Sequence, residues 1–219
     1  MMSKALPLLL ALAAAVFTLP AAHAQDAAAG AQKAAMCSGC HGIPGYQSSF
    51  PEIAKVPMIS GQGADYLNAA LAAYKKGERR HPTMRAIAAS LSDADMADLA
   101  AYYQQHGASM IKPVADTPAA QPSAEVAALL AKGACASCHG ANYSKPVAPA
   151  YPKLAGQHAD YLASALRAYG TEGNPKIGRA NAIMSAQVKQ FKPAELRAMA
   201  AYLGSLPGEL RTVPQPKFK

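Results

Sequence analysis

A pentapeptide of the form Cys-x-x-Cys-His occurs twice in this 219-residue chain, and it constrains the fold more than any other feature of the sequence. The two copies span residues 37–41 and 135–139, and together they contain all four cysteines. A second block, Gly-Gln-x-x-Asp-Tyr-Leu at residues 61–67, returns at residues 156–162. The offset between matched blocks stays between 95 and 100 residues, which indicates an internal duplication into two homologous halves.

The spacing within each pentapeptide is the attachment signature of c-type haem. Two thiols add across the two vinyl groups of one porphyrin, and the histidine that follows projects its imidazole toward the iron. We therefore predict two covalently bound haem c groups. The predicted attachment cysteines are Cys37 and Cys40 for the first haem and Cys135 and Cys138 for the second, and the predicted axial histidines are His41 and His139.

Other uses of paired cysteines fit this sequence less well. A zinc ribbon needs its two Cys-x-x-Cys pairs about 15–20 residues apart, whereas these pairs lie in separate repeats. A thioredoxin-like site needs a βαβ setting, for which no pattern is present. Structural disulfides suit an exported protein, but they would not require a histidine after the second cysteine in both copies.

The sixth iron ligand must come from elsewhere in each half, and the duplication nominates a methionine. Met84 and Met184 match at an offset of 100 residues, and each precedes the last predicted helix of its half. His81 is the rival in the first half, but its counterpart is Asn181, and His158 is likewise unmatched. We predict Met84 and Met184 as axial ligands, against the alternative that each is a flexible core filler.

The core-filling alternative suits three other methionines, which lie inside predicted helices: Met36, Met96 and Met199. Pro57 and Pro152 occupy matched places in the loop after each pentapeptide. A carbonyl there could accept the second ring N–H of the axial histidine, which is how such ligands are usually oriented. Simple turn formation is an equal alternative for these two prolines.

The N-terminus has the parts of a secretory signal peptide. Lys4 precedes an apolar run over residues 5–19, and Ala22-His23-Ala24 forms a small-x-small cleavage site. The run is short for a membrane span. We expect residues 1–24 to be removed and the mature chain, beginning at Gln25, to be exported to the periplasm.

The remaining chain divides into a first domain (25–112), a Pro-rich linker (113–122), a second domain (123–207) and a tail (208–219) that we expect to lie across the surface. Apolar periodicity predicts three helices in each half. They cover residues 26–38, 63–76 and 92–105 in the first half, and 123–136, 158–169 and 193–205 in the second. A polar loop is expected before each last helix. The predicted fold class is all-α, a tandem duplication of two small helical domains, each wrapped around one haem.

Composition supports this organisation. Alanine accounts for 52 residues, so a half of about 90 residues has few bulky core formers, and a covalent group would fill its interior. Charged residues are only 16% of the chain, which argues against nucleic-acid binding despite the net charge of +8. Residues 113–219 carry net +6 and residues 25–112 net +1. We expect the basic half to dock on an acidic redox partner or an anionic membrane surface, with simple solubilisation as the alternative.

Taken together, the two pentapeptides, the Gly-Gln-x-x-Asp-Tyr-Leu blocks and the matched methionines resemble the dihaem cytochromes of the cytochrome c4 family over the whole mature chain. The resemblance implies two class I cytochrome c domains related by pseudo-twofold symmetry, with His/Met ligation in both. It also implies periplasmic electron transfer, often to a terminal oxidase, with peripheral membrane association in some members. Two segments depart mildly from the repeat, namely residues 143–151 and 191–196.

Two protein ligands saturate each iron, which favours outer-sphere electron transfer over substrate chemistry. We predict an electron carrier rather than an enzyme, with a cytochrome bc1-type or other redox donor and a terminal oxidase or reductase as acceptor. Two alternatives remain open. One is a dihaem enzyme with one open haem, peroxidase-like or oxidising small sulfur compounds, and the other is the electron-accepting subunit of a dehydrogenase.

Overall fold

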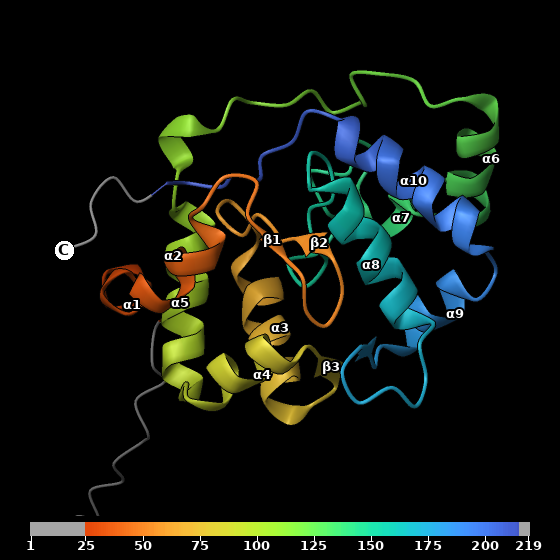
Figure 1. The fold of residues 1–219 in the computed structure, drawn as a ribbon. Coiled ribbons are helices and arrows are strands. Elements are labelled where there is room, and N and C mark those ends of the chain that lie inside the picture. Colours follow the sequence, from red (N-terminus) through yellow and green to blue (C-terminus); the bar gives the residue numbers. More distant parts are fainter. Residues whose placement is uncertain (1–24, 215–219) are drawn as a thin grey trace, which may run out of the picture.

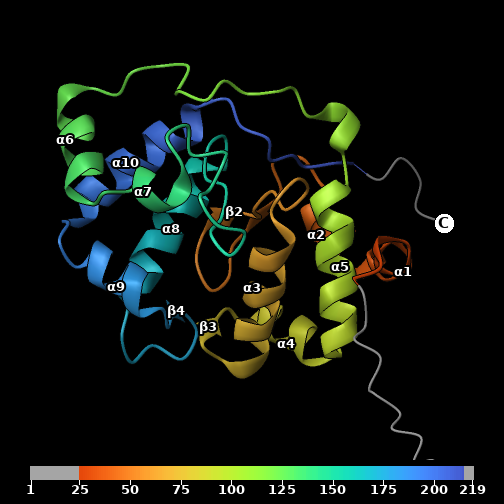
Figure 2. The ribbon, with the colours of Figure 1, turned by 180° about the vertical axis from the view of Figure 1, so that it is seen from behind.

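The repeated sequence folds into two helical halves that lie side by side (Figures 1 and 2). The structure is a computed structural model that describes residues 25–214; the predicted signal peptide lies outside the described residues. The first half contains α1 (Ala27–Lys33), α2 (Ala35–His41), β1 (Gln47–Ser48), β2 (Ala54–Lys55), α3 (Ala64–Lys76), β3 (Arg79–Arg80), α4 (Pro82–Ala89), α5 (Asp93–Gln105) and the 3-10 turn η1 (Ala108–Met110). The second half contains α6 (Ala124–Lys132), α7 (Ala136–His139), α8 (Ala159–Tyr169), β4 (Gly178–Arg179), α9 (Ala182–Val188) and α10 (Pro193–Ser205).

The last helix of each half begins where its sequence provides a start signal. Ser92 caps α5 by accepting from the Asp95 backbone N–H, and the Asp95 carboxylate accepts from the Ser92 backbone in return. Pro193 is the first residue of α10, a position where its missing N–H costs nothing. Both helices, and with them the predicted all-α class, are confirmed.

Two details of the predicted helices are wrong. The helix that leads into each pentapeptide is broken, at Ala34 in the first half and after Lys132 in the second, where Ala134 adopts a left-handed φ of 45°. The expected polar loop before the last helix contains a short helix in each half, α4 and α9. Their seven or eight residues give too few turns for an apolar period to stand out.

Each half has its own core, built around its last helix. In the first half α5 packs on α1 and α3 and buries Met96 and Leu99, and in the second half α10 packs on α8 and α6 and buries Met199 and Leu203. Met96 and Met199 are therefore core fillers, as predicted. Met36 is not, because its side chain is 50% exposed on α2.

Strand pairing and the two connecting segments join the halves. β3 and β4 form an antiparallel pair across the boundary, with Arg79 opposite Arg179. The Pro-rich linker runs along the top of Figure 1, and the segment after α10 returns to the first half. There the Arg211 backbone N–H donates to the Ser60 carbonyl over 3.0 Å. Among residues 25–214, no helix combines the length and apolarity needed to cross a membrane.

The crossing of α1 and α5 depends on Gly30. A Cβ on this glycine would clash with the Asp98 carbonyl oxygen and lie 2.8 Å from the Cβ of Tyr102. We expect Gly30→Ala to lower the free energy of unfolding by about 1–3 kcal/mol, because the helices must separate to accept it. The measurement is thermal unfolding followed by far-ultraviolet circular dichroism. Gly170→Ala, just after α8, is the control, since the nearest atoms to its Cβ would lie at 3.5 and 3.6 Å, an ordinary van der Waals contact, and equal effects of the two changes would contradict the packing described.

Candidate haem sites

The histidine of the first pentapeptide is held by the loop that follows it. His41 is the last residue of α2, and its Nδ1–H donates to the Pro57 carbonyl over 2.8 Å. Burial lowers the pKa of His41, the bond to Pro57 opposes this, and the charges of His81 and Arg79 lower it further. The imidazole is therefore neutral near pH 7, and its Nε2 is left to coordinate a metal.

The second half repeats this arrangement. His139 ends α7, its side chain is buried, and its Nδ1–H donates to the Pro152 carbonyl over 2.9 Å. Burial lowers the pKa of His139, and the bond to Pro152 partly offsets that shift. The interpretation of Pro57 and Pro152 as carbonyl acceptors, rather than as turn formers alone, is confirmed.

The predicted second-half residues line one cavity of about 310 Å³. Its second-half wall includes Cys135, Cys138, His139 and Met184. Its first-half wall includes Pro57, Met58, Tyr66 and Arg79. All four cysteines of the chain are free thiols, so no disulfide competes for the predicted attachment positions.

The predicted first-half residues lie on two short helices, with Cys37, Cys40 and His41 on α2 and Met84 in the first turn of α4. The charge of His81, the residue that caps α4, contributes to lowering the pKa of His41. Cys37 packs against the first-half core.

The unmatched pair of His81 and Asn181 has a shared structural role. His81 Nδ1 accepts from the Met84 backbone N–H over 3.4 Å, and Asn181 Oδ1 accepts from the Met184 backbone N–H over 2.9 Å. Each side chain thus caps the helix that carries the matched methionine. This role explains why a histidine and an asparagine can occupy equivalent positions, and it needs no ligation by His81.

Two arginines lie where the halves meet, Arg79 buried and Arg179 partly buried, and the sequence-based predictions did not include them. The Arg79 side chain, on a residue that is 8% exposed, donates to the Tyr66 hydroxyl over 3.3 Å and to the Tyr161 hydroxyl over 2.8 Å. Arg179 donates to the same Tyr161 hydroxyl over 3.1 Å. Burial alone would raise the pKa of Tyr161, but the two guanidinium groups outweigh it and lower that pKa to about 8.

The charges of these arginines suit a site that holds a haem better than they suit a purely apolar pocket. Within residues 25–214 neither guanidinium pairs with a carboxylate, and the Arg79 Nε is buried with no hydrogen-bond partner. Burying the Arg79 guanidinium without a charged partner is costly, and the partly buried Arg179 beside it is also unpaired with a carboxylate, so the site calls for an anion. A haem has an apolar ring and two propionates, which suits a cavity lined by apolar side chains and Arg79 and Arg179. The two arginines recur at the offset of 100 residues that links the methionines, and that signal could have identified them.

A scan of protein-family models matches this chain to cytochrome c twice, over residues 27–107 and residues 123–207. The cytochrome c4 of Pseudomonas aeruginosa is 34% identical over 190 residues, which cover 84% of this chain and 91% of that protein. The cytochrome c4 of Azotobacter vinelandii is 34% identical over 204 residues, with the same coverage. A thiosulfate dehydrogenase electron acceptor of Stutzerimonas stutzeri is 32% identical, covering 81% of this chain and 82% of that protein.

Solved structures give the same result for the fold. The crystal structure of reduced recombinant cytochrome c4 from Pseudomonas stutzeri matches with a TM-score of 0.59 at 28% identity. The match covers 84% of this chain and all of that one.

The arginine pair at the boundary predicts an electrostatic effect on the haem potentials. We expect Arg79→Gln to lower the reduction potential of at least one haem, because a nearby buried cation disfavours the more positive ferric state. Spectroelectrochemical titration measures the shift. Arg197→Gln removes an exposed charge from α10 and is the control, for which we expect no resolved change. Equal shifts in the two variants would show that Arg79 does not act on a haem at short range.

Proposed function

Because this chain belongs to the dihaem cytochrome c4 family of electron-transfer cytochromes, we propose that it carries electrons in the periplasm between a respiratory donor and a terminal oxidase or reductase. Its two tandem cytochrome c domains each bind one haem c covalently. The observation that carries the proposal is the repetition of one ligand arrangement in both halves. Each half has a histidine oriented by a loop carbonyl and a methionine at the start of a capped short helix.

We assign the site residues accordingly. Cys37 and Cys40 would attach the first haem, and Cys135 and Cys138 the second. His41 with Met84, and His139 with Met184, would be the axial ligands. When bound, each haem supplies an iron that alternates between the ferrous and ferric states. With both axial positions taken by the protein, neither site would bind a small substrate without losing its methionine.

The chain's own residues suit a carrier. The Pro57 and Pro152 carbonyls fix the ring orientation of the two histidines, and apolar side chains of both halves line the cavity beside His139. Such an environment limits the rearrangement that accompanies a change of iron charge. Arg79 and Arg179, which line this cavity at the boundary between the halves, would hold haem propionates there.

The methionine assignment predicts a spectroscopic change. We expect Met84→Ala or Met184→Ala to remove the far-red methionine–iron charge-transfer band of one haem, to let that haem bind carbon monoxide when reduced, and to lower its reduction potential. Optical spectra of the purified ferric and ferrous protein measure all three. Met110→Ala, which changes an exposed methionine of η1, is the control. A wild-type protein that already binds carbon monoxide would instead favour an enzyme with an open haem.

A second candidate for the role rests on two of the relatives. Thiosulfate dehydrogenase electron acceptors from Stutzerimonas stutzeri and Thiomonas intermedia are 32% and 30% identical to this chain, over 81% and 82% of its length. As the alternative, we propose that the protein is the same kind of electron carrier but accepts its electrons from a sulfur-oxidising dehydrogenase. Rapid reduction of the ferric protein by a thiosulfate dehydrogenase with thiosulfate would favour it over a respiratory donor.

Charge asymmetry supports docking through the second half. That half has the greater net positive charge, so we expect electron transfer to oxidase-containing membranes to slow steeply as salt is added. Arg197→Glu, on the exposed face of α10, should flatten this salt dependence more than Lys112→Glu, which reverses an exposed charge of the first half. A rate that does not change with salt would rule out electrostatic docking.

Export to the periplasm is a proposal based on the signal-peptide pattern of residues 1–24.

A further inference from the structure

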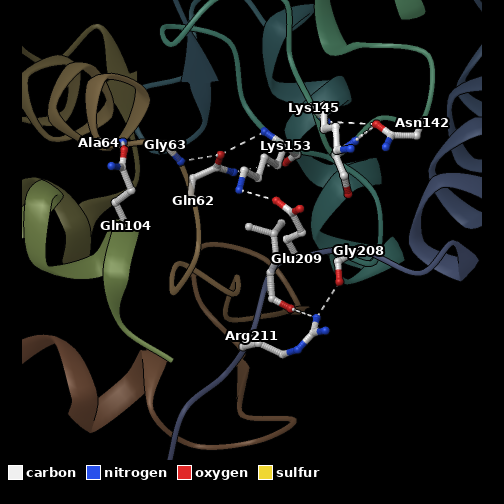
Figure 3. Close-up of polar contacts among 12 residues, drawn as sticks. Gln62, Gly63, Ala64, Gln104, Asn142, Lys145, Lys153, Gly208, Glu209 and Arg211 are labelled. Carbon is white, nitrogen blue, oxygen red and sulfur yellow. Dashed lines mark hydrogen bonds and ion pairs between the residues drawn. The ribbon is translucent and has the colours of Figure 1, made fainter. Parts of the chain in front are cut away.

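Two buried glutamines, Gln62 and Gln157, form matched hydrogen bonds across the boundary between the halves. The Gln62 residue is 4% exposed, and its side chain reaches from the first half to Lys153 in the second half (Figure 3). Its Nε2 donates to the Lys153 carbonyl over 3.1 Å, and its Oε1 accepts from the Lys153 backbone N–H over 2.9 Å. The same Oε1 accepts from Gly63 N–H over 3.0 Å, so both ends of the amide are paired.

Gln157 makes the same bonds in the opposite direction. It is also 4% exposed, and its Nε2 donates to the Met58 carbonyl over 2.9 Å. Its Oε1 accepts from the Met58 backbone N–H over 3.0 Å and from the His158 backbone N–H over 3.0 Å. Each glutamine therefore clamps both backbone groups of one residue in the other half.

The clamped residues are the ones that follow the two prolines. Met58 comes directly after Pro57, whose carbonyl accepts from His41, and Lys153 comes directly after Pro152, whose carbonyl accepts from His139. The N–H of each clamped residue belongs to the same planar peptide unit as the proline carbonyl, so the clamp fixes where that carbonyl points. The support for each histidine thus originates in the half that does not contain it.

We propose that Gln62 positions His139 and that Gln157 positions His41, so that each half sets the ligand strength of the other half's haem. The proposal rests on the ligation of haem iron by these histidines, as assigned above. The two glutamines are positioning residues, because they act on the histidines through Lys153 and Pro152, or through Met58 and Pro57.

The physical link is the strength of the histidine's second hydrogen bond. A firmly held carbonyl at Nδ1 raises the basicity of the imidazole and favours the ferric iron, and such outer partners have large effects on metal sites. Loss of a clamp would let the carbonyl move away and raise the potential of the haem in the opposite half. The two loops differ in one respect. Lys153 is also tethered by a 2.6 Å ion pair to Glu209 (Figure 3), whereas Met58 has no side-chain charge, so Gln157 should matter more than Gln62.

The test is a crossed pattern of reduction potentials in the intact dihaem protein. We expect Gln62→Leu to raise the potential of the second-half haem, and Gln157→Leu to raise that of the first-half haem by a larger amount. The Met84→Ala and Met184→Ala proteins assign each potential to its half. The ring-nitrogen chemical shifts of the axial histidines should move in the same crossed way, and loss of domain packing alone would not produce that selectivity.

Gln104→Leu is the matched control. Gln104 makes its bond within the first half, where its Oε1 accepts from the Ala64 N–H over 2.8 Å (Figure 3), so we expect no selective shift. If a leucine variant fails to fold, Gln62→Asn and Gln157→Asn keep a neutral amide that is one methylene too short to bond both backbone groups, and they should give smaller shifts with the same crossed pattern.

The possible outcomes distinguish an error in the ligand assignment from an error in the crossed positioning. If the methionine variants leave both haem spectra unchanged, the ligand assignment of the proposed function is wrong. If they mark one haem each, but a glutamine variant shifts the haem of its own half, both haems equally or neither, the ligands stand and the crossed positioning is overturned.

Discussion

The hydrogen bond from each pentapeptide histidine to a proline carbonyl is the contact on which the rest of the structure depends. It links the short helix that carries His41 or His139 to the loop that follows it. That loop is also the surface through which the halves meet, since the residue after each proline is clamped by a glutamine from the opposite side. Local ligand geometry and the packing of the two halves are therefore parts of one arrangement.

The polar character of the boundary follows from the composition of the chain. Alanine-rich helices provide thin cores, so each half on its own leaves much of its interior to be filled. The boundary gathers what a haem requires, namely apolar walls, tyrosine hydroxyls and two guanidinium groups without a carboxylate partner in the described chain. A polar boundary of this kind is stable only when its charges are matched, which ties the association of the halves to cofactor binding.

Sequence reasoning succeeded where a feature is local or repeated. The last helix of each half and the proline carbonyls that accept from His41 and His139 could be predicted, because each depends on short spacing or on the duplication. It failed for Met36, because helical position does not determine exposure, and for α4 and α9, which are too short to display a period. In the sequence, Gln62 could be recognised only as part of a repeated block. Its hydrogen-bond partner, Lys153, lies 91 residues away, so the bond is apparent only in the folded protein.

The segment after α10 limits how the two halves can move relative to each other. Glu209 contacts Lys153 in the second half, and Arg211 pairs with Ser60 in the first, so the last described segment contacts both sides of the boundary. These two contacts lie only two residues apart along the chain, so the segment between them has little slack. Any separation of the halves must therefore break at least one of the two contacts.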